Sequence, residues 1–147
     1  MGYNHHISKT DLARNTHHVI REAQKGYTVL VENHGQAEVA IVDIIDFQLQ
    51  RAVIHYFSSP KKYADDLEVS ESMLESLTTD QDQFNLVIGH YLADHQSIGR
   101  SAELLGMSTP ELMLRLRRSG VTLRVGPESD GELEEELKII EESLRRK

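Results

Sequence analysis

The chain has 147 residues, 39% hydrophobic and 27% charged, which is enough for one ordinary domain or two very small ones. Sixteen basic and 24 acidic residues give a net charge of −8, which excludes a globally basic DNA-binding protein, so any contact with nucleic acid needs a local basic face. The absence of cysteine excludes a disulfide framework, a thiolate metal site and a thiol nucleophile. There is no signal pattern at the N-terminus and no apolar run near 18 residues, so we expect a cytoplasmic protein without a membrane segment.

The first 60 residues have the pattern of a small module of strands and helices. We expect a strand over 3–7 and then a helix that begins at Lys9, behind a cap formed by Ser8 and Asp11, and ends at Gly26. Two β-branched runs, 28–33 and 38–43, predict a hairpin around His34-Gly35-Gln36, with the glycine supplying a positive φ. A further helix over 45–57 ends before a proline.

The rest of the chain reads as an acidic linker followed by helices. Residues 61–84 carry two basic and seven acidic side chains, and we expect a linker over 61–83 with at most one short helix. Helices are predicted over 84–93, 98–105 and 110–119, an extended piece over 121–125, and a terminal acidic helix over 128–147. The expected fold class is α+β, with a small antiparallel sheet in module 1–60 and an all-α module over 84–127.

Enzyme chemistry finds little support in the residues. Eight histidines invite a metal hypothesis, but neighbouring pairs such as His5-His6 and His17-His18 diverge on a strand or a helix. His90 and His95 miss the i,i+4 spacing of a helical zinc pair, so we expect solvent-facing or packing histidines. No acidic pair, glycine-rich phosphate loop or nucleophile elbow is evident, and we predict no catalytic residue, no metal and no cofactor.

Residues 97–120 are typical of a helix-turn-helix. Ala102 lies four residues before Gly106, which takes the turn, and a capped helix follows whose Leu112 and Leu116 face inward. Arginines on and near this helix would contact phosphates or bases if it entered a groove. The alternative is a three-helix packing unit with a solvated arginine face.

The stretch 3–60 resembles the Phd/YefM (prevent-host-death) antitoxins of bacterial toxin–antitoxin pairs. The matching features, in order, are Ile7-Ser8, Asp11-Leu12-Ala13-Arg14-Asn15, the stop at Gly26, the strand pair around Gly35 and the Val-Asp-x-x-Asp-Phe motif at 42–47. The resemblance implies a homodimer that binds operator DNA through its strand–helix region, with a later segment that wraps the toxin. Arg14 matches the basic residue used on DNA, with Lys9, Thr10 and Asn15 beside it. The chain departs from the family at Glu32-Asn33-His34, where basic residues usually precede the turn glycine.

The stretch 84–127 resembles small proteins found as antitoxin partners of PIN-domain ribonucleases. The shared features are Ile98-Gly-Arg-Ser-Ala-Glu-Leu-Leu-Gly-Met, the helix from Ser108 to Gly120, and the Leu123-Arg-Val-Gly-Pro exit. A PIN-type ribonuclease is therefore the favoured toxin, with RelE-like ribonucleases and Doc-like kinases as alternatives. The residues expected to contact DNA in the two modules are Lys9, Thr10, Arg14, Asn15, Arg100, Thr109, Arg115, Arg117 and Arg118.

The acidic terminal helix carries one apolar stripe, made by Leu133, Leu137, Ile140 and Leu144. This stripe either anchors the helix in the basic cleft of a toxic ribonuclease or packs internally. We therefore expect the antitoxin of a type II toxin–antitoxin system, which neutralises its toxin by direct binding and regulates its own operon as a homodimer or higher oligomer. The alternatives are a stand-alone helix-turn-helix regulator or adaptor, and a metal-dependent enzyme built on the histidines.

Overall fold

The computed structural model describes residues 4–59, 69–123, 138–143 and 145. It divides into two compact units, Met1–Phe47 with Leu144–Lys147, and Gln48–Ser143. The division therefore falls inside helix α3 (Ile44–Ser58), whereas the sequence predicted a module boundary at residue 60. The reason is that α3 supplies fully buried residues to the second unit, Leu49 and Ala52.

The first unit begins with strand β1 (Asn4–Ser8) and helix α1 (Lys9–Arg14). Ser8 caps α1 as predicted, because its Oγ accepts a hydrogen bond of 3.1 Å from the Asp11 N–H. The predicted single helix is broken at Asn15, and helix α2 (Thr16–Gln24) follows. Asn15 and Thr16 donate side-chain hydrogen bonds to carbonyls of α1, which is how such residues compete with helical bonding.

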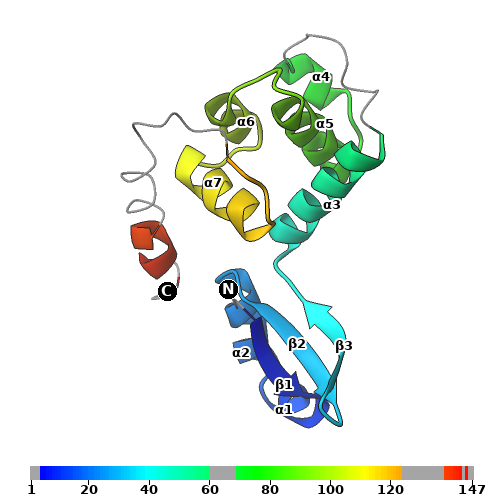
Figure 1. Cartoon of the computed structure of the whole chain (residues 1–147), viewed down its shortest axis with the longest axis vertical. Coiled ribbons are helices and arrows are strands. Elements are labelled where there is room, and N and C mark those ends of the chain that lie inside the picture. Colours follow the sequence, from blue (N-terminus) through cyan, green and yellow to red (C-terminus); the bar gives the residue numbers. More distant parts are fainter. Residues whose placement is uncertain (1–3, 60–68, 124–137, 144, 146–147) are drawn as a thin grey trace. The chain divides into compact units, whose positions relative to one another are not determined.

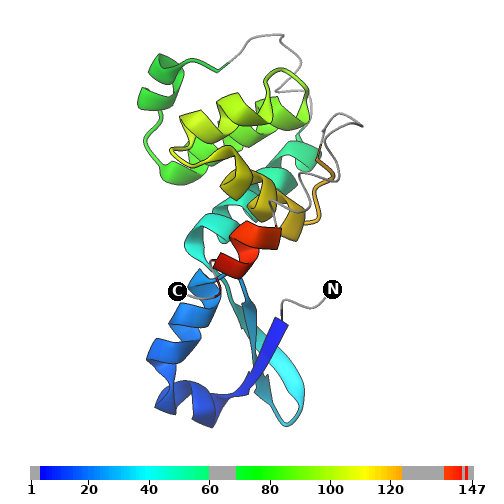
Figure 2. The same cartoon turned by 90° about the vertical axis from the view of Figure 1, so that its left-hand side faces the viewer.

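Three strands form the sheet, in the order β1, β2 (Thr28–Asn33), β3 (Gln36–Ile41). The prediction of an antiparallel sheet is correct for β2 and β3 and wrong for β1 and β2, which run parallel, with Asn4 opposite Thr28. The sheet is mixed because α1 and α2 form a crossover that returns the chain to the end where β1 started. Figure 2 shows both helices on one side of the sheet.

The hairpin between β2 and β3 turns at His34 and Gly35, whose φ values are 52° and 78°. Two successive residues with positive φ match a two-residue turn, which is one residue shorter than the predicted turn His34-Gly35-Gln36. Gly35 has a positive φ, as predicted. A bulge in the β2–β3 register follows Val31, beyond which Glu32 pairs with Ala37.

The second unit is helical. After α3 come α4 (Glu71–Glu75), α5 (Asp80–Leu92), α6 (Ile98–Leu104) and α7 (Thr109–Arg118), as labelled in Figure 1. The α3 start follows from Asp43, whose carboxylate accepts hydrogen bonds from the N–H groups of Ile45 and Asp46. Fully or almost fully buried side chains of this unit include Leu49, Ile88, Tyr91, Leu112 and Leu116. Together with the small mixed sheet, these helices confirm the α+β class.

Residues 69–83 are part of the fold and not the linker that the sequence predicted. Val69, Leu74 and Val87 form a buried cluster, and partly buried leucines pack against it. The acidic composition concealed this packing because the apolar residues are widely spaced in the chain. Residues 60–68 of the predicted linker lie outside the described residues.

The terminal acidic helix is described over 138–143, which is helical as predicted. The rest of 128–147, apart from Arg145, lies outside the described residues, as do residues 124 and 125 of the predicted extended piece. Residues 121–123 form no strand. In the described part of the chain, no helix combines the length and apolar character needed to cross a bilayer.

Candidate nucleic-acid interface

The predicted DNA contacts of the first unit lie together on α1 and at its end. Lys9, Thr10, Arg14 and Asn15 are all exposed. The helix begins where β1 ends, because the Ser8 cap converts the extended chain directly into a helical turn. The short strand and helix therefore bring two basic side chains and two polar ones to one exposed segment.

Lys9 and Asn15 are already engaged within the unit. Lys9 Nζ lies 2.6 Å from Glu38 Oε2, and Asn33 Nδ2 donates to the other oxygen of the same carboxylate at 3.2 Å. These hydrogen bonds, from Lys9 first and then from Asn33, lower the pKa of Glu38 below its ordinary value. Asn15 Nδ2 donates to the Asp11 carbonyl. A phosphate would have to compete with Glu38 for Lys9.

Thr10 and Arg14 differ from Lys9 and Asn15 in their side-chain contacts. Neither side chain makes a hydrogen bond or an ion pair with another described residue. They are four residues apart in α1 and therefore share one face of the helix. An exposed guanidinium with a hydroxyl one turn earlier on the same face is suited to a phosphate, since both groups donate hydrogen bonds.

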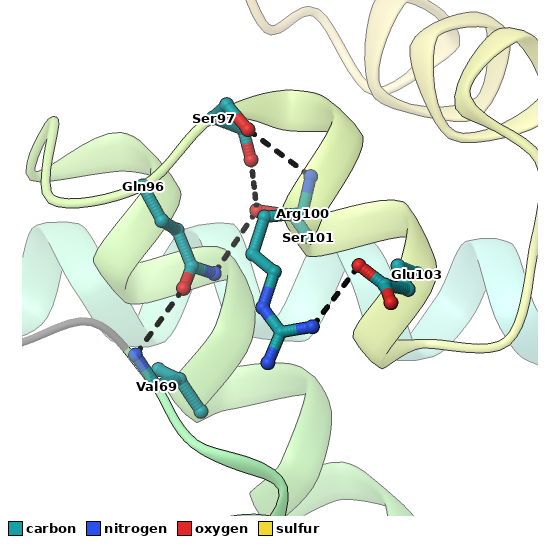
Figure 3. Close-up of polar contacts among 6 residues, drawn as sticks. All are labelled: Val69, Gln96, Ser97, Arg100, Ser101 and Glu103. Carbon is teal, nitrogen blue, oxygen red and sulfur yellow. Dashed lines mark hydrogen bonds and ion pairs between the residues drawn. The ribbon is translucent and has the colours of Figure 1, made fainter.

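The arginines of the second unit are less accessible than their number suggests. Arg100 pairs with Glu103 at 3.0 Å, as Figure 3 shows, and Arg115 donates to Glu111 Oε1 through two nitrogens at 3.2 Å. The side chain of Arg115 is 12% exposed. Thr109 and Arg118 are half-buried, so Arg117 is the one predicted contact of α7 that is exposed.

The turn between α6 and α7 has the shape that the sequence predicted. Gly106 has a φ of 71°, Ala102 is 1% exposed, and Ser108 caps α7 by accepting a hydrogen bond from the Glu111 N–H. However, Leu112, Met113, Leu114 and Leu116 are all buried. A recognition helix must present a face to the groove, whereas α7 is covered around most of its circumference. This geometry favours the packing alternative for α5, α6 and α7.

A buried polar network that the sequence analysis missed organises the α5–α6 connection (Figure 3). Gln96, 6% exposed, donates to the Val87 carbonyl at 3.1 Å and to Ser101 Oγ at 3.0 Å, and accepts from the Val69 N–H at 3.4 Å. Ser101 in turn donates to the Ser97 carbonyl. All polar groups of the amide are used, so Gln96 ties three distant segments together. No local pattern marks such a residue, because its partners lie 5, 9 and 27 residues away in the chain.

Six of the eight histidines fall into three separate pairs, His5-His6, His17-His18 and His90 with His95. His5 lies 3.2 Å from Glu22 and stacks on Tyr27, whereas His6 contacts Glu32, so the two neighbours point to opposite faces of the sheet as predicted. His90 and His95 approach each other at the end of α5. In the described part of the chain, no three or more histidine, aspartate or glutamate side chains gather closely enough to form a metal site of their own.

Of the predicted toxin anchors, Ile140 is half-buried, and Leu133, Leu137 and Leu144 lie outside the described residues. The neighbouring Ile139, which the predicted stripe omitted, is 65% exposed. Within the first unit, the Arg145 guanidinium lies 5.1 Å from the centre of the Tyr27 ring, a cation–π distance.

Comparison of the chain with protein-family models, with curated proteins and with solved structures found no match. A function for this chain is therefore inferred from the motifs of its sequence and from the geometry of the described residues.

Proposed function

We propose that this chain is the antitoxin of a type II toxin–antitoxin pair, which binds its toxin directly and binds operator DNA through its first unit. The observation that carries the proposal is the face of α1 on which Thr10 and Arg14 stand exposed, with no partner among the described residues. The order of strand, helix, hairpin and helix over 4–58 is also the order of motifs that resembles the Phd/YefM antitoxins. The second unit acts mainly as a packed helical module, because α7 offers little free surface.

A second copy of the chain completes the first unit. Its buried apolar side chains among the described residues are small: Val19, Ala23, Val29 and Val31. β3 is an edge strand, and Val39 on it is 56% exposed. Exposed apolar residues on a strand with an unpaired edge favour association with a second copy of the chain. Their burial in a dimer interface would add stability that the small apolar core of the first unit does not supply. The homodimer would present two copies of Arg14, as a palindromic operator requires.

The acidic C-terminal stretch binds the toxin. Residues 127–147 carry eight acidic and four basic side chains. A ribonuclease toxin holds RNA in a basic cleft, which an acidic helix with apolar anchors can occupy. Ile139, Ile140 and the predicted anchors beyond the described residues would supply the apolar contacts. A PIN-type ribonuclease is the favoured toxin, and RelE-like and Doc-like toxins are the alternatives.

The decisive experiment is the isolation of the tagged chain at native expression from its own host, with mass spectrometry of proteins that co-purify in stoichiometric amount. A small basic ribonuclease or kinase, toxic when expressed alone and harmless when co-expressed with this chain, is the expected result. Recovery of DNA with no protein partner would instead identify a stand-alone regulator.

A second experiment assigns the DNA contact to one unit. Binding to the upstream DNA is measured by fluorescence anisotropy at several salt concentrations for the natural chain and for Arg14→Ala and Arg117→Ala. We expect Arg14→Ala to weaken binding about tenfold and to lower the salt slope by about 0.9 for each phosphate that the arginine neutralises. Arg117→Ala is the matched control, an exposed arginine on α7, and its binding should stay unchanged. The reverse pattern would move the DNA contact to the helix pair.

A further inference from the structure

Two imidazole rings meet at the C-terminal end of α5. His90 Nδ1 and His95 Nδ1 are 3.3 Å apart, with ring centres separated by 5.3 Å and ring planes inclined at 59°. His90 is 6% exposed and His95 is half-buried. Neither histidine belongs to the DNA face or to the predicted toxin anchors.

The backbone explains how residues five apart come together. Asp94 has a φ of 66°, which ends the helix and turns the chain back toward it. The Asp94 N–H donates to the Tyr91 carbonyl at 3.1 Å, and the His95 N–H donates to the His90 carbonyl at 2.9 Å. The i,i+4 rule for helical metal pairs does not apply here, because His95 lies beyond the helix and is folded back onto it. These hydrogen bonds fix the backbone of the turn, so the two residues are already close together before a ligand binds.

The separation of the two nitrogens matches a metal-binding geometry. In tetrahedral coordination with zinc–nitrogen bonds of about 2.0–2.1 Å, two ligating nitrogens are about 3.3–3.4 Å apart. Neutral imidazole is also a preferred ligand of zinc and nickel. The alternative for the same distance is an N–H···N hydrogen bond between the rings. A cation bound to both Nδ1 atoms would displace that proton, which would move to Nε2 of the same ring.

Solvent reaches this histidine pair from the side of His95, whereas His90 is buried. His95 lines an open pocket of about 460 Å³, together with Tyr91, Asp94, Gln96, Ser97 and Ile98. Because no third histidine or carboxylate of the described residues completes a cluster, water would fill the other coordination positions.

We propose that His90 and His95 form a two-histidine site for a divalent transition cation of the zinc or nickel type. The bound cation links the last turn of α5 to the turn that leads into α6, next to the Gln96 network. With two protein ligands the site leaves coordination positions open to water and is not a closed structural site. The proposal is independent of DNA or toxin binding.

The test is a calorimetric titration of the full chain with zinc chloride alone at pH 7.5, repeated for two variants. His95→Gln removes one ligand at a half-buried position and should weaken zinc binding about tenfold or more. The control is the double variant His17→Gln/His18→Gln, which removes two exposed histidines of α2 and should bind zinc as the natural chain does. His95 is chosen over His90 because His90 is buried, and a melting curve without zinc checks that His95→Gln remains folded.

A second readout is thermal stability. Zinc in excess should raise the melting temperature of the natural chain and of the control, since a ligand that binds the folded state stabilises it, and should raise that of His95→Gln clearly less. Equal zinc affinity of His95→Gln and the natural chain would overturn the proposal, because the ion would then bind elsewhere. Loss of binding in the control, or no binding by the natural chain, would overturn it as well.

Discussion

The two units of this chain differ in how they are stabilised. Among the described residues, the second unit buries large side chains such as Leu49, Tyr91, Leu112 and Leu116, whereas the buried apolar residues of the first unit are valines and one alanine. The second unit also contains the buried amide of Gln96 with all its partners. The first unit instead exposes Val39 on an edge strand, and Arg14 with no partner among the described residues. The contrast indicates that the larger buried core lies in the helical unit, whereas the sheet unit has the smaller core and carries the face proposed to bind DNA.

The largest effect on stability should follow from shortening a buried side chain in the core of the second unit. Leu116→Ala removes a side chain that is 0% exposed and should lower the free energy of unfolding by about 2–5 kcal/mol, because a cavity remains. Urea unfolding followed by circular dichroism measures this. The matched control is Ile54→Ala on α3, where the side chain is 64% exposed and about 0.5 kcal/mol or less is expected. Equal losses would mean that Ile54 is covered by another surface.

The second largest effect on stability should follow from removing the buried hydrogen bonds of Gln96. Gln96→Ala leaves the Val69 N–H, the Val87 carbonyl and Ser101 without this partner and should cost about 1–3 kcal/mol in the same unfolding experiment. Gln24→Ala, at an exposed position in the first unit, serves as the control and should be nearly neutral. If Gln96→Ala is also neutral, the network does not contribute to the stability of the second unit.

The proposed dimer can be tested with substitutions on strand β3 of the first unit. Val39→Ser makes the exposed part of β3 polar and should raise the dimer dissociation constant about tenfold, since interface positions that matter cost more than about 1 kcal/mol. Sedimentation equilibrium over a range of concentrations reports this. Gln36→Ser on the same strand replaces an exposed polar residue by another and should leave the dimer intact. A natural chain that is monomeric at all concentrations would refute this role of β3.

The smallest effect concerns pH. Hydrogen bonds from Lys9 and then Asn33 lower the pKa of Glu38 in the folded protein, so their stabilising effect is present above the pKa of the unfolded chain. That effect is lost as the pH falls through the lowered pKa. The melting temperature of Glu38→Gln should therefore be slightly below that of the natural chain at pH 7, and the difference should close in acid. A difference between Glu38→Gln and the natural chain that stays constant as the pH falls would exclude the mechanism.

The sequence determined the local features of this protein. Ser8 and Ser108 cap helices, Gly35 and Gly106 take turns with positive φ, and the helices of the second unit lie close to their predicted places. These features depend on hydrogen bonds and backbone preferences within about four residues, which a pattern records directly.

Only the tertiary structure decided which distant segments meet. Three features depend on contacts between residues far apart in the chain: the parallel pairing of β1 with β2, the burial of Val69 and Leu74, and the burial of four residues of α7. The meeting of His90 and His95 is shorter in range, yet it depends on the left-handed backbone of Asp94, which an aspartate adopts only in particular surroundings. Composition and spacing do not encode such pairings, because many arrangements bury the same apolar residues equally well.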